Sequence, residues 1–400
     1  MMPRESADVV IVGGGVVGSS IAYHLRRDGF TGRIVVAERD STYARASSFL
    51  AMGGVRQQFG SAANIAMAQY SIRFYREFDE RMTVGDYISR AWFRQRGYLF
   101  LVNHESAERF ERRLESQRAL GAKVERLSVS AIRERLPEIE LGDIAFGVIG
   151  PDDGYANPRQ VLAGFRAGAA HQGVEYADAE VIAIEHDARG VSGVTLNAAG
   201  GTTRLATRTV VNAAGAYASH VGDMAGVDLP VRPQRQHLFR LELPRTWPYR
   251  FPMVIDPSGV HWRHDDATTP DGPDRIVVAK TNTAEPEGEN LACDPDRFER
   301  DVRADLLGRM PAFADATVVE GWAGLYEMSP DHNAIIGEHP DRKGFYLANG
   351  FSGHGLMMAP ATGKAVADLI RTGRSETIDI SKFDLTRFAR GEPFWDDAML

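Results

Sequence analysis

Three glycines near the start of the chain, Gly13, Gly15 and Gly18, follow the spacing G-x-G-x-x-G. They come directly after a short apolar run, residues 9–12, so the pattern predicts a buried strand, a tight turn and a helix. In such a unit the first glycine permits the turn, the second lets the backbone approach a pyrophosphate, and the third lets the helix pack on the strand. Residues 8–25 are therefore predicted to bind a dinucleotide. A glycine turn without a ligand is the alternative.

An acidic residue stands where such a site needs one. A second apolar run, residues 34–37, ends at Glu38, which lies 20 residues after Gly18. A carboxylate at this position accepts hydrogen bonds from the hydroxyl groups of a ribose. The acid makes the dinucleotide interpretation more specific than the glycines alone.

The segment 44–60 is rich in small and polar residues and is predicted to be a loop that passes a ligand. Short side chains let the backbone approach closely, and the hydroxyl groups of Ser47 and Ser48 can bond to phosphate or sugar oxygens. An ordinary helix cap explains the two serines equally well.

The composition limits the class of protein. Lys and Arg number 46 against 54 for Asp and Glu, and the net charge of −8 argues against nucleic acid as a partner. The single cysteine, Cys293, excludes an intrachain disulfide and a cysteine-based metal site, and no metal is predicted. No apolar run approaches the roughly 18 residues of a membrane span, and the first strand begins too early for a signal peptide. We expect a cytoplasmic protein without a transmembrane segment.

The two ends of the chain are predicted to build one domain. Near the end, strand 344–348, a glycine turn at 349–355 and helix 360–370 repeat the order of elements seen at the start. Between them, residues 227–326 read as an antiparallel sheet. The predicted fold is α/β: a Rossmann-like domain of residues 1–85, 145–225 and 327–400, with a second domain of residues 86–144 and 226–326 inserted.

Four motifs in order carry a family likeness: GGGVVGSSIAYHL, DDGYANP, VVNAAGAYA and GLYEMSPDHNAIIG…GFYLANGFSGHGLMMAPATG. Together they resemble the D-amino-acid oxidase superfamily of flavoproteins, nearest the sarcosine oxidase and glycine oxidase branch. The resemblance implies FAD bound across a domain of the glutathione-reductase type, with the flavin ring facing the inserted sheet. It also implies oxidation of a carbon–nitrogen bond by hydride transfer to flavin.

The resemblance also assigns residues to the cofactor. Those expected near the adenosine and pyrophosphate are Gly13, Gly15, Val17, Gly18, Glu38, Arg39 and, at the adenine, Val181. Those expected near the flavin are Ser47, Ser48, Gly353, Gly355, Leu356 and Met357, and the small-residue turn with Ala214 and Gly215 is expected to face the same cofactor. His354 is interpreted either as a contact of flavin or substrate or as a turn residue.

The chain departs from the family pattern at the places that set attachment and substrate. Gly324 stands at the position of the cysteine that holds flavin covalently in monomeric sarcosine oxidases, so we expect noncovalent FAD. The positions that bind a substrate carboxylate in the two enzyme groups fall on Met357, Phe59 and Tyr326, and Arg56 is the nearest remaining cation by motif position.

The lysine that promotes oxygen reduction in sarcosine oxidases falls on Val277. Lys280 lies three positions further, on the opposite face of the predicted strand. Oxygen, an electron-transfer protein and a quinone all stay open as electron acceptors, and so does the oligomeric state.

Two aromatic residues, Trp262 and Tyr326, are predicted to wall the substrate, with core packing as the alternative. His261 and Arg263 lie on the other face of the same strand and are weaker candidates. The predicted catalytic set is Arg56, Tyr326, His354 and Trp262.

The preferred function is an FAD-dependent amine or amino-acid oxidoreductase, in which an uncharged amine gives a hydride to flavin and the resulting imine hydrolyses. Arg56 and backbone amides are expected to favour the reduced ring. A 2-hydroxyacid or polyol dehydrogenase is the alternative and would need His261 or His354 as a base. A third possibility is a flavoprotein that serves in assembly without catalysis.

Overall fold

The computed structural model describes residues 6–267 and 274–396, and its first part is organised around a six-stranded sheet. The central strands are apolar on both faces, which suits a sheet covered on both sides. All neighbouring strands are parallel except the pair β18–β19. Their order is β18 (Ile335–Glu338), β19 (Phe345–Asn349), β12 (Val210–Asn212), β1 (Val9–Val12), β2 (Ile34–Glu38) and β8 (Glu175–Asp178).

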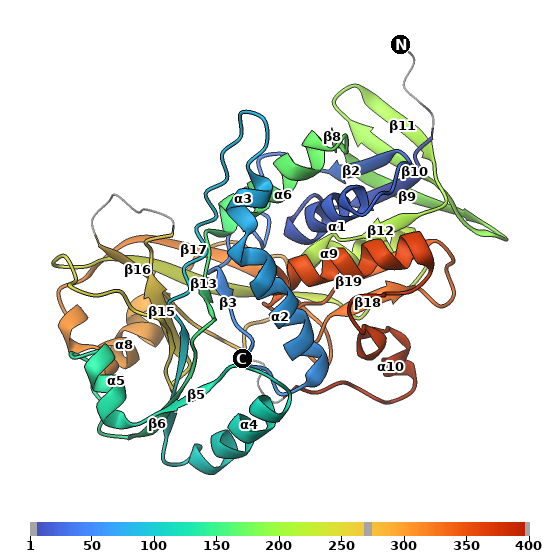
Figure 1. Cartoon of the computed structure of the whole chain (residues 1–400). Coiled ribbons are helices and arrows are strands. Elements are labelled where there is room, and N and C mark those ends of the chain that lie inside the picture. The colour runs from blue at the N-terminus through green and yellow to red at the C-terminus, as the bar shows by residue number, and fades with distance from the viewer. Residues whose placement is uncertain (1–5, 268–273, 397–400) are drawn as a thin grey trace.

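Helices cover one face of this sheet and a small sheet covers the other (Figure 1). On the first face Gly363 brings two helices close together, because a Cβ there would lie 2.2 Å from the Ser20 hydroxyl oxygen. The helices of this face are α1 (Val16–Arg27), α2 (Ala62–Arg76), α3 (Phe78–Met82), α6 (Pro158–His171) and α9 (Gly355–Thr372). The other face carries β9 (Glu180–Asp187), β10 (Gly190–Ala198), β11 (Gly201–Ala206) and α7 (Ala218–Met224).

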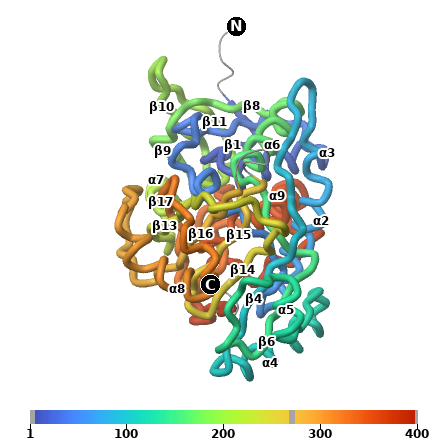
Figure 2. The backbone as a smooth tube through the Cα atoms, turned by 90° about the vertical axis from the view of Figure 1, so that its left-hand side faces the viewer, coloured from blue at the N-terminus to red at the C-terminus, as the bar shows by residue number. Residues whose placement is uncertain are grey.

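The second part of the molecule is an eight-stranded sheet, and Figure 2 shows it below the first part. A core that includes Leu99, Trp262 and Leu306 fills one face of the sheet. The strand order is β17 (Thr317–Met328), β13 (Arg232–Glu242), β16 (Arg275–Lys280), β15 (Val260–His264), β14 (Met253–Ile255), β4 (Tyr98–Asn103), β6 (Ile144–Gly150) and β5 (Glu125–Leu127). Its helices are α4 (Ala107–Ala119), α5 (Val129–Arg135) and α8 (Arg303–Arg309), and α10 (Thr386–Ala389) follows near the end of the chain.

The expected α/β fold with an inserted sheet is confirmed, with one difference in the pairing of strands. The inserted sheet is antiparallel except at β14 and β4, which run parallel. These two strands come from the two separate inserted segments, so no hairpin constrains their direction. A short two-stranded sheet of β3 (Gly54–Val55) and β7 (Gly154–Tyr155) lies where the chain passes between the two parts.

The division into domains stays a prediction, and the pairing of β6 bears on one boundary. The predicted boundary at residue 145 falls in β6, which pairs with β4 from Tyr98 opposite Gly150 to Asn103 opposite Ile144. Through this pairing β6 belongs to the eight-stranded sheet up to Gly150. Strand pairing across more than 40 residues is not visible in the local sequence.

The last long helix starts earlier than expected. The sequence predicts a helix over 360–370, because proline favours a first helical position, but α9 begins at Gly355 and contains Pro360. The missing N–H of Pro360 leaves the Leu356 carbonyl without its usual donor. The Tyr75 hydroxyl donates to this carbonyl at 2.5 Å, which replaces the lost bond and extends the helix toward the glycine turn.

Within residues 6–267 and 274–396, no helix is both long and apolar enough to cross a membrane. The cytoplasmic location stays a prediction.

Candidate active site

A cavity of about 670 Å³ lies between the two parts of the molecule. This volume is in the range of sites for small molecules and cofactors. Of the nineteen residues predicted as catalytic or cofactor-binding, sixteen line it: Gly13, Gly15, Val17, Glu38, Arg39, Ser47, Ser48, Val181, Ala214, Gly215, Tyr326, Gly353, His354, Gly355, Leu356 and Met357. The other three, Gly18, Arg56 and Trp262, do not line it.

The first glycine turn and the N-terminus of α1 form one wall of the cavity. Gly13 has φ of +98°, and a Cβ there would lie 2.5 Å from the Ala213 carbonyl oxygen. Gly18 lies behind the turn, where a Cβ would come within 2.0 Å of the Gly13 carbonyl oxygen. Its role is therefore helix packing, as the motif predicts. Gly15, Val16 and Val17 line the cavity at the N-terminus of α1, and a helix N-terminus suits a phosphate anion.

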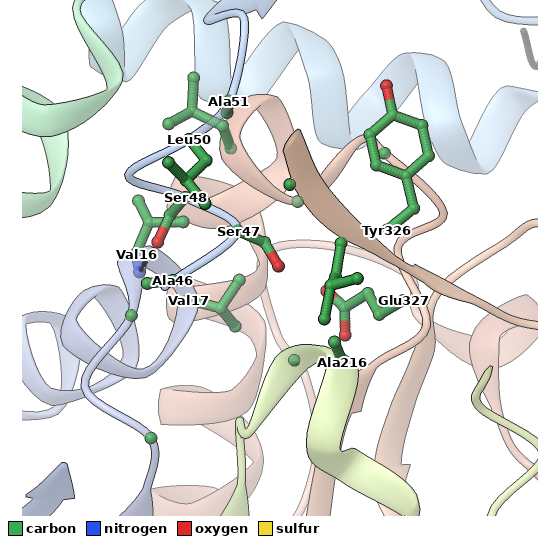
Figure 3. A pocket seen from close by; sticks show the side chains of 18 of the residues that line it. Val16, Val17, Ala46, Ser47, Ser48, Leu50, Ala51, Ala216, Tyr326 and Glu327 are labelled. Carbon is green, nitrogen blue, oxygen red and sulfur yellow. Dashed lines mark hydrogen bonds between the residues drawn. The ribbon is translucent and has the colours of Figure 1, made fainter. Parts of the chain in front are cut away.

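Ser48 holds the loop 44–51 against this helix. The Val16 N–H donates to the Ser48 hydroxyl oxygen at 3.3 Å, and Figure 3 shows the two residues side by side at the pocket wall. Ser47 lies next along the same loop and also lines the cavity. The loop expected to pass a ligand therefore borders the pocket.

Glu38 forms the acidic end of the cavity. One carboxylate oxygen accepts the Gly14 N–H at 2.9 Å and the other accepts the Asp40 N–H at 2.9 Å. Burial raises the pKa of Glu38, and these two N–H groups oppose the shift. The carboxylate therefore joins the glycine turn to the segment that follows β2 and retains lone pairs for a further donor.

Arg39 and Val181 frame the same end. The Arg39 guanidinium lies 3.7 Å from the centre of the Tyr217 ring, and one of its nitrogens is 3.9 Å from the Glu180 carboxylate. Val181 is buried on β9 and borders the cavity. An apolar side chain beside a stacked cation suits a flat aromatic base.

The second glycine turn forms the opposite wall. Gly353 has φ of +93°, and a Cβ there would lie 2.5 Å from the Tyr326 ring, so the ring packs directly on the turn. Helix α9 begins at Gly355 without a side-chain cap. The unpaired amides of its first turn, where Leu356 and Met357 line the cavity, form a site for negative charge.

His354 borders the cavity, and Arg56 lies behind it. The Arg56 Nη2 atom is 3.3 Å from His354 Nε2, and His354 Nδ1 is 3.3 Å from the Phe351 carbonyl oxygen. Burial and the Arg56 cation lower the pKa of His354 to about 3, so the imidazole is neutral near pH 7. In this state Nδ1–H donates to Phe351 and Nε2 accepts from Arg56. Both ring nitrogens are therefore engaged.

Arg56 is wholly buried, and its guanidinium carbon lies 4.1 Å from the centre of the Phe59 ring. Asp153, which belongs to the motif DDGYANP, lies in the same polar cluster. Asp153 accepts the Gln57 N–H at 3.2 Å and the Gln58 Nε2–H at 3.2 Å, and burial raises its pKa to about 7. No local pattern distinguishes this aspartate from an ordinary turn residue, because its partners are nearly 100 residues away.

Trp262 was predicted in the substrate wall, but the structure places it outside the cavity lining. Its side chain has no exposed surface and belongs to the core on the far face of the eight-stranded sheet. Because side chains alternate along β15, the neighbouring His261 points to the opposite face and lines the cavity. His261 Nδ1 lies 3.0 Å from the Gly259 carbonyl oxygen. The sequence gives the two faces of this strand but does not say which one meets the cofactor.

Val277 lies on the cavity side of its strand. It is buried with Leu238 and Ala279, which both line the cavity. Lys280 also borders the cavity, but its ammonium group is 2.5 Å from the Asp305 carboxylate. Position 277, where sarcosine oxidases are expected to have a lysine, therefore belongs to an apolar patch in this protein.

Tyr98 and Glu327 are among the lining residues that the sequence did not indicate. Tyr98 begins a strand that reads as core, and burial raises the pKa of its hydroxyl to about 12. Glu327 follows Tyr326 and lines the cavity, but the same strand also contains Glu320, so the local sequence does not single it out.

These features define an FAD-dependent oxidoreductase. The glycine turn, the amides of α1 and Glu38 suit the adenosine and pyrophosphate, and the second glycine turn meets the inserted sheet where a flavin ring would lie. The family model described as DAO, FAD dependent oxidoreductase, matches residues 8–369, and the chain belongs to this family.

Three similar proteins extend this result. "FAD-dependent oxidoreductase domain-containing protein 1" from Bos taurus is 34% identical and covers 100% of this chain and 88% of its own length. Glycine oxidase from Geobacillus kaustophilus is 28% identical over 95% of this chain and 97% of its own length. The solved structure of L-proline dehydrogenase from P. horikoshii has a TM-score of 0.86 and 28% identity, with 98% of this chain and 100% of the other covered.

Proposed function

We propose that the protein oxidises the carbon–nitrogen bond of a secondary amine or amino acid. The observation that carries the proposal is the state of His354, whose two ring nitrogens are both occupied by protein groups. The imidazole is therefore unavailable as a base, which suits hydride transfer from an uncharged amine. The similarity to proteins named glycine oxidase and L-proline dehydrogenase supports the same substrate class.

Bound FAD would supply the acceptor for the hydride in this reaction. The substrate's carbon–hydrogen bond breaks with its electron pair leaving as hydride, the nitrogen lone pair forms the iminium ion, and loss of the N–H proton to solvent gives the imine. Water then hydrolyses the imine to a carbonyl compound and an amine. Tyr326 and Tyr98 line the cavity and orient the substrate. The amides at the start of α9, with the Arg56 cation behind His354, stabilise the negative charge that develops on reduction.

The wall of the cavity bears on which amine is bound. Met357 and Tyr326 border the cavity at two family carboxylate positions, and Phe59, at the third, is fully buried. Lys280 also lines the cavity, but its ammonium group pairs with the Asp305 carboxylate. A carboxylate without a cationic partner is costly in such a site. We therefore propose a bulkier or less acidic amine than sarcosine or glycine.

A 2-hydroxyacid or polyol dehydrogenase is the second candidate, and His261 favours it. Burial lowers the pKa of His261, and the Gly259 carbonyl fixes the proton on Nδ1, which leaves Nε2 as an acceptor at the cavity. A neutral imidazole in this state can take the hydroxyl proton that alcohol oxidation releases.

The experiment is anaerobic addition of a substrate panel to the FAD-loaded protein, with flavin bleaching as the readout. The panel contains N-methyl amino acids, cyclic imino acids, D-amino acids and 2-hydroxyacids. The proposal predicts bleaching by an amine and retention of that rate in His261→Asn. Bleaching by a 2-hydroxyacid alone, lost in His261→Asn, would establish the second candidate. No bleaching by any compound would favour a flavoprotein without this catalysis.

A further inference from the structure

Glu327 is a carboxyl group on the cavity wall that no step above uses. It lies next to Tyr326 on β17, and both residues line the cavity. Figure 3 shows the two side chains pointing in different directions, with Glu327 on the side of the pocket where Ala216 lies. Glu327 therefore faces the cofactor cavity from a position separate from the predicted substrate wall.

Glu327 holds the second glycine turn. Its Oε2 atom accepts the Gly350 N–H at 3.0 Å, and its main-chain carbonyl accepts the Ser352 N–H at 3.0 Å. A Cβ at Gly355 would lie 3.6 Å from Oε1. The carboxyl group thus binds the start of the turn and lies close to the first residue of α9.

No cation forms an ion pair with Glu327 within residues 6–267 and 274–396. Burial raises the pKa of the Glu327 carboxyl to about 8, against the lowering effect of the Gly350 and Phe351 N–H groups. Two neighbours, Tyr326 and His354, are neutral near pH 7, because burial raises the pKa of the first and lowers that of the second. A carboxylate here would therefore be an uncompensated charge.

Three other charged or titratable side chains on the elements around this point of β17 contact groups other than Glu327. The Arg232 guanidinium on β13 donates to the Leu229 and Val231 carbonyls at 3.1 Å each. His220 lies 3.4 Å from Glu289. Tyr217, on the segment that contains Ala216, stacks under Arg39. None of them replaces the missing cation.

We propose that Glu327 couples reduction of the bound flavin to the uptake of a proton at the cavity wall. Two electrons and one proton added to FAD leave one extra negative charge in the site, and an ionised Glu327 repels that charge. Reduction then favours transfer of a second proton from solvent to the Glu327 carboxylate. By linkage, ionisation of Glu327 must weaken reduction by the same factor.

The test is the midpoint potential of the FAD-loaded protein, measured by titration with dithionite and mediator dyes across about pH 6 to 10. Above the pKa of about 8, the wild-type curve should steepen by one proton for each two electrons. The extra slope is a tenfold change in the equilibrium constant for reduction per pH unit, which corresponds to about 30 mV in the midpoint potential. Glu327→Gln keeps the shape without the titration and should lack the extra slope.

Glu180→Gln is the matched control, because Glu180 also lines the cavity but lies at the adenine end and is half exposed. Its curve should follow the wild type. A wild-type curve with unchanged slope above pH 8 overturns the proposal, as does an extra slope that persists in Glu327→Gln. If that variant loses FAD, the wild-type curve alone decides. The titration needs no substrate, so its outcome is independent of the amine proposal.

Discussion

Replacing Glu38 with alanine should weaken FAD binding without preventing folding of the sheet. The carboxylate ends β2, and its two oxygens each accept one backbone N–H, from Gly14 and Asp40. The same oxygens have lone pairs left for the ribose hydroxyl groups. A hydrogen bond to a charged group contributes about 1.5–3 kcal/mol, so its loss corresponds to a roughly ten- to hundredfold higher Kd.

Glu180→Ala is the control for this change. Glu180 lines the same end of the cavity, but its carboxylate is half exposed and lies 3.9 Å from Arg39. An exposed ion pair of this kind contributes only about 0–1 kcal/mol, so Kd should rise by less than about fivefold.

The assay removes FAD by dialysis at high bromide concentration and follows its rebinding by quenching of flavin fluorescence. Equal Kd values for Glu38→Ala and wild type would refute the reasoning and leave Glu38 as the end of a strand only. Equal losses in the two variants would assign the effect to general charge at the cavity mouth.

Three further predictions concern attachment, acceptor and substrate. Because Gly324 lines the cavity where the family's linking cysteine would stand, acid precipitation should release all the flavin, and a yellow pellet would contradict this. Because Val277 is apolar and lies beside Leu238 and Ala279, reduced enzyme should reoxidise slowly in aerated buffer compared with an acceptor dye, and Val277→Lys should speed it. Wild type that reoxidises as fast with oxygen as with the dye, with no gain from lysine, would contradict that account. Sarcosine and glycine should bleach the flavin slowly, and fast bleaching at micromolar sarcosine would show that a carboxylate site exists after all.

The first part of the fold could be predicted because its signals are local. Two apolar runs, a glycine turn and Glu38 lie within 40 residues, and the structure brings them together at one end of the cavity. The resemblance located the second glycine turn for the same reason. Its helix was placed five residues late, because the bond from Tyr75 that lets Pro360 sit inside α9 joins residues far apart in sequence.

The inserted sheet was harder to interpret. Alternation along residues 260–264 identifies two faces, yet aromatic character alone pointed to Trp262, which suits a core equally well. Which face of β15 lines the cavity depends on how the strands are arranged in the sheet, and in the structure His261 lies on that face. Asp153 and Glu327 stayed unnoticed because each is defined by partners from another segment, the first by Gln57 and Gln58 and the second by Gly350.

The central claim is that an uncharged amine loses a hydride to the bound flavin. The most direct measurement is anaerobic stopped-flow reduction of the flavin by the best amine of the panel. The amine is compared in two forms, with hydrogen or with deuterium on the carbon beside nitrogen, and the carbonyl product is then quantified. The account predicts slower flavin reduction with the deuterated amine and one carbonyl product for each flavin reduced. Bleaching that yields no carbonyl product, or that occurs only with 2-hydroxyacids, would contradict it.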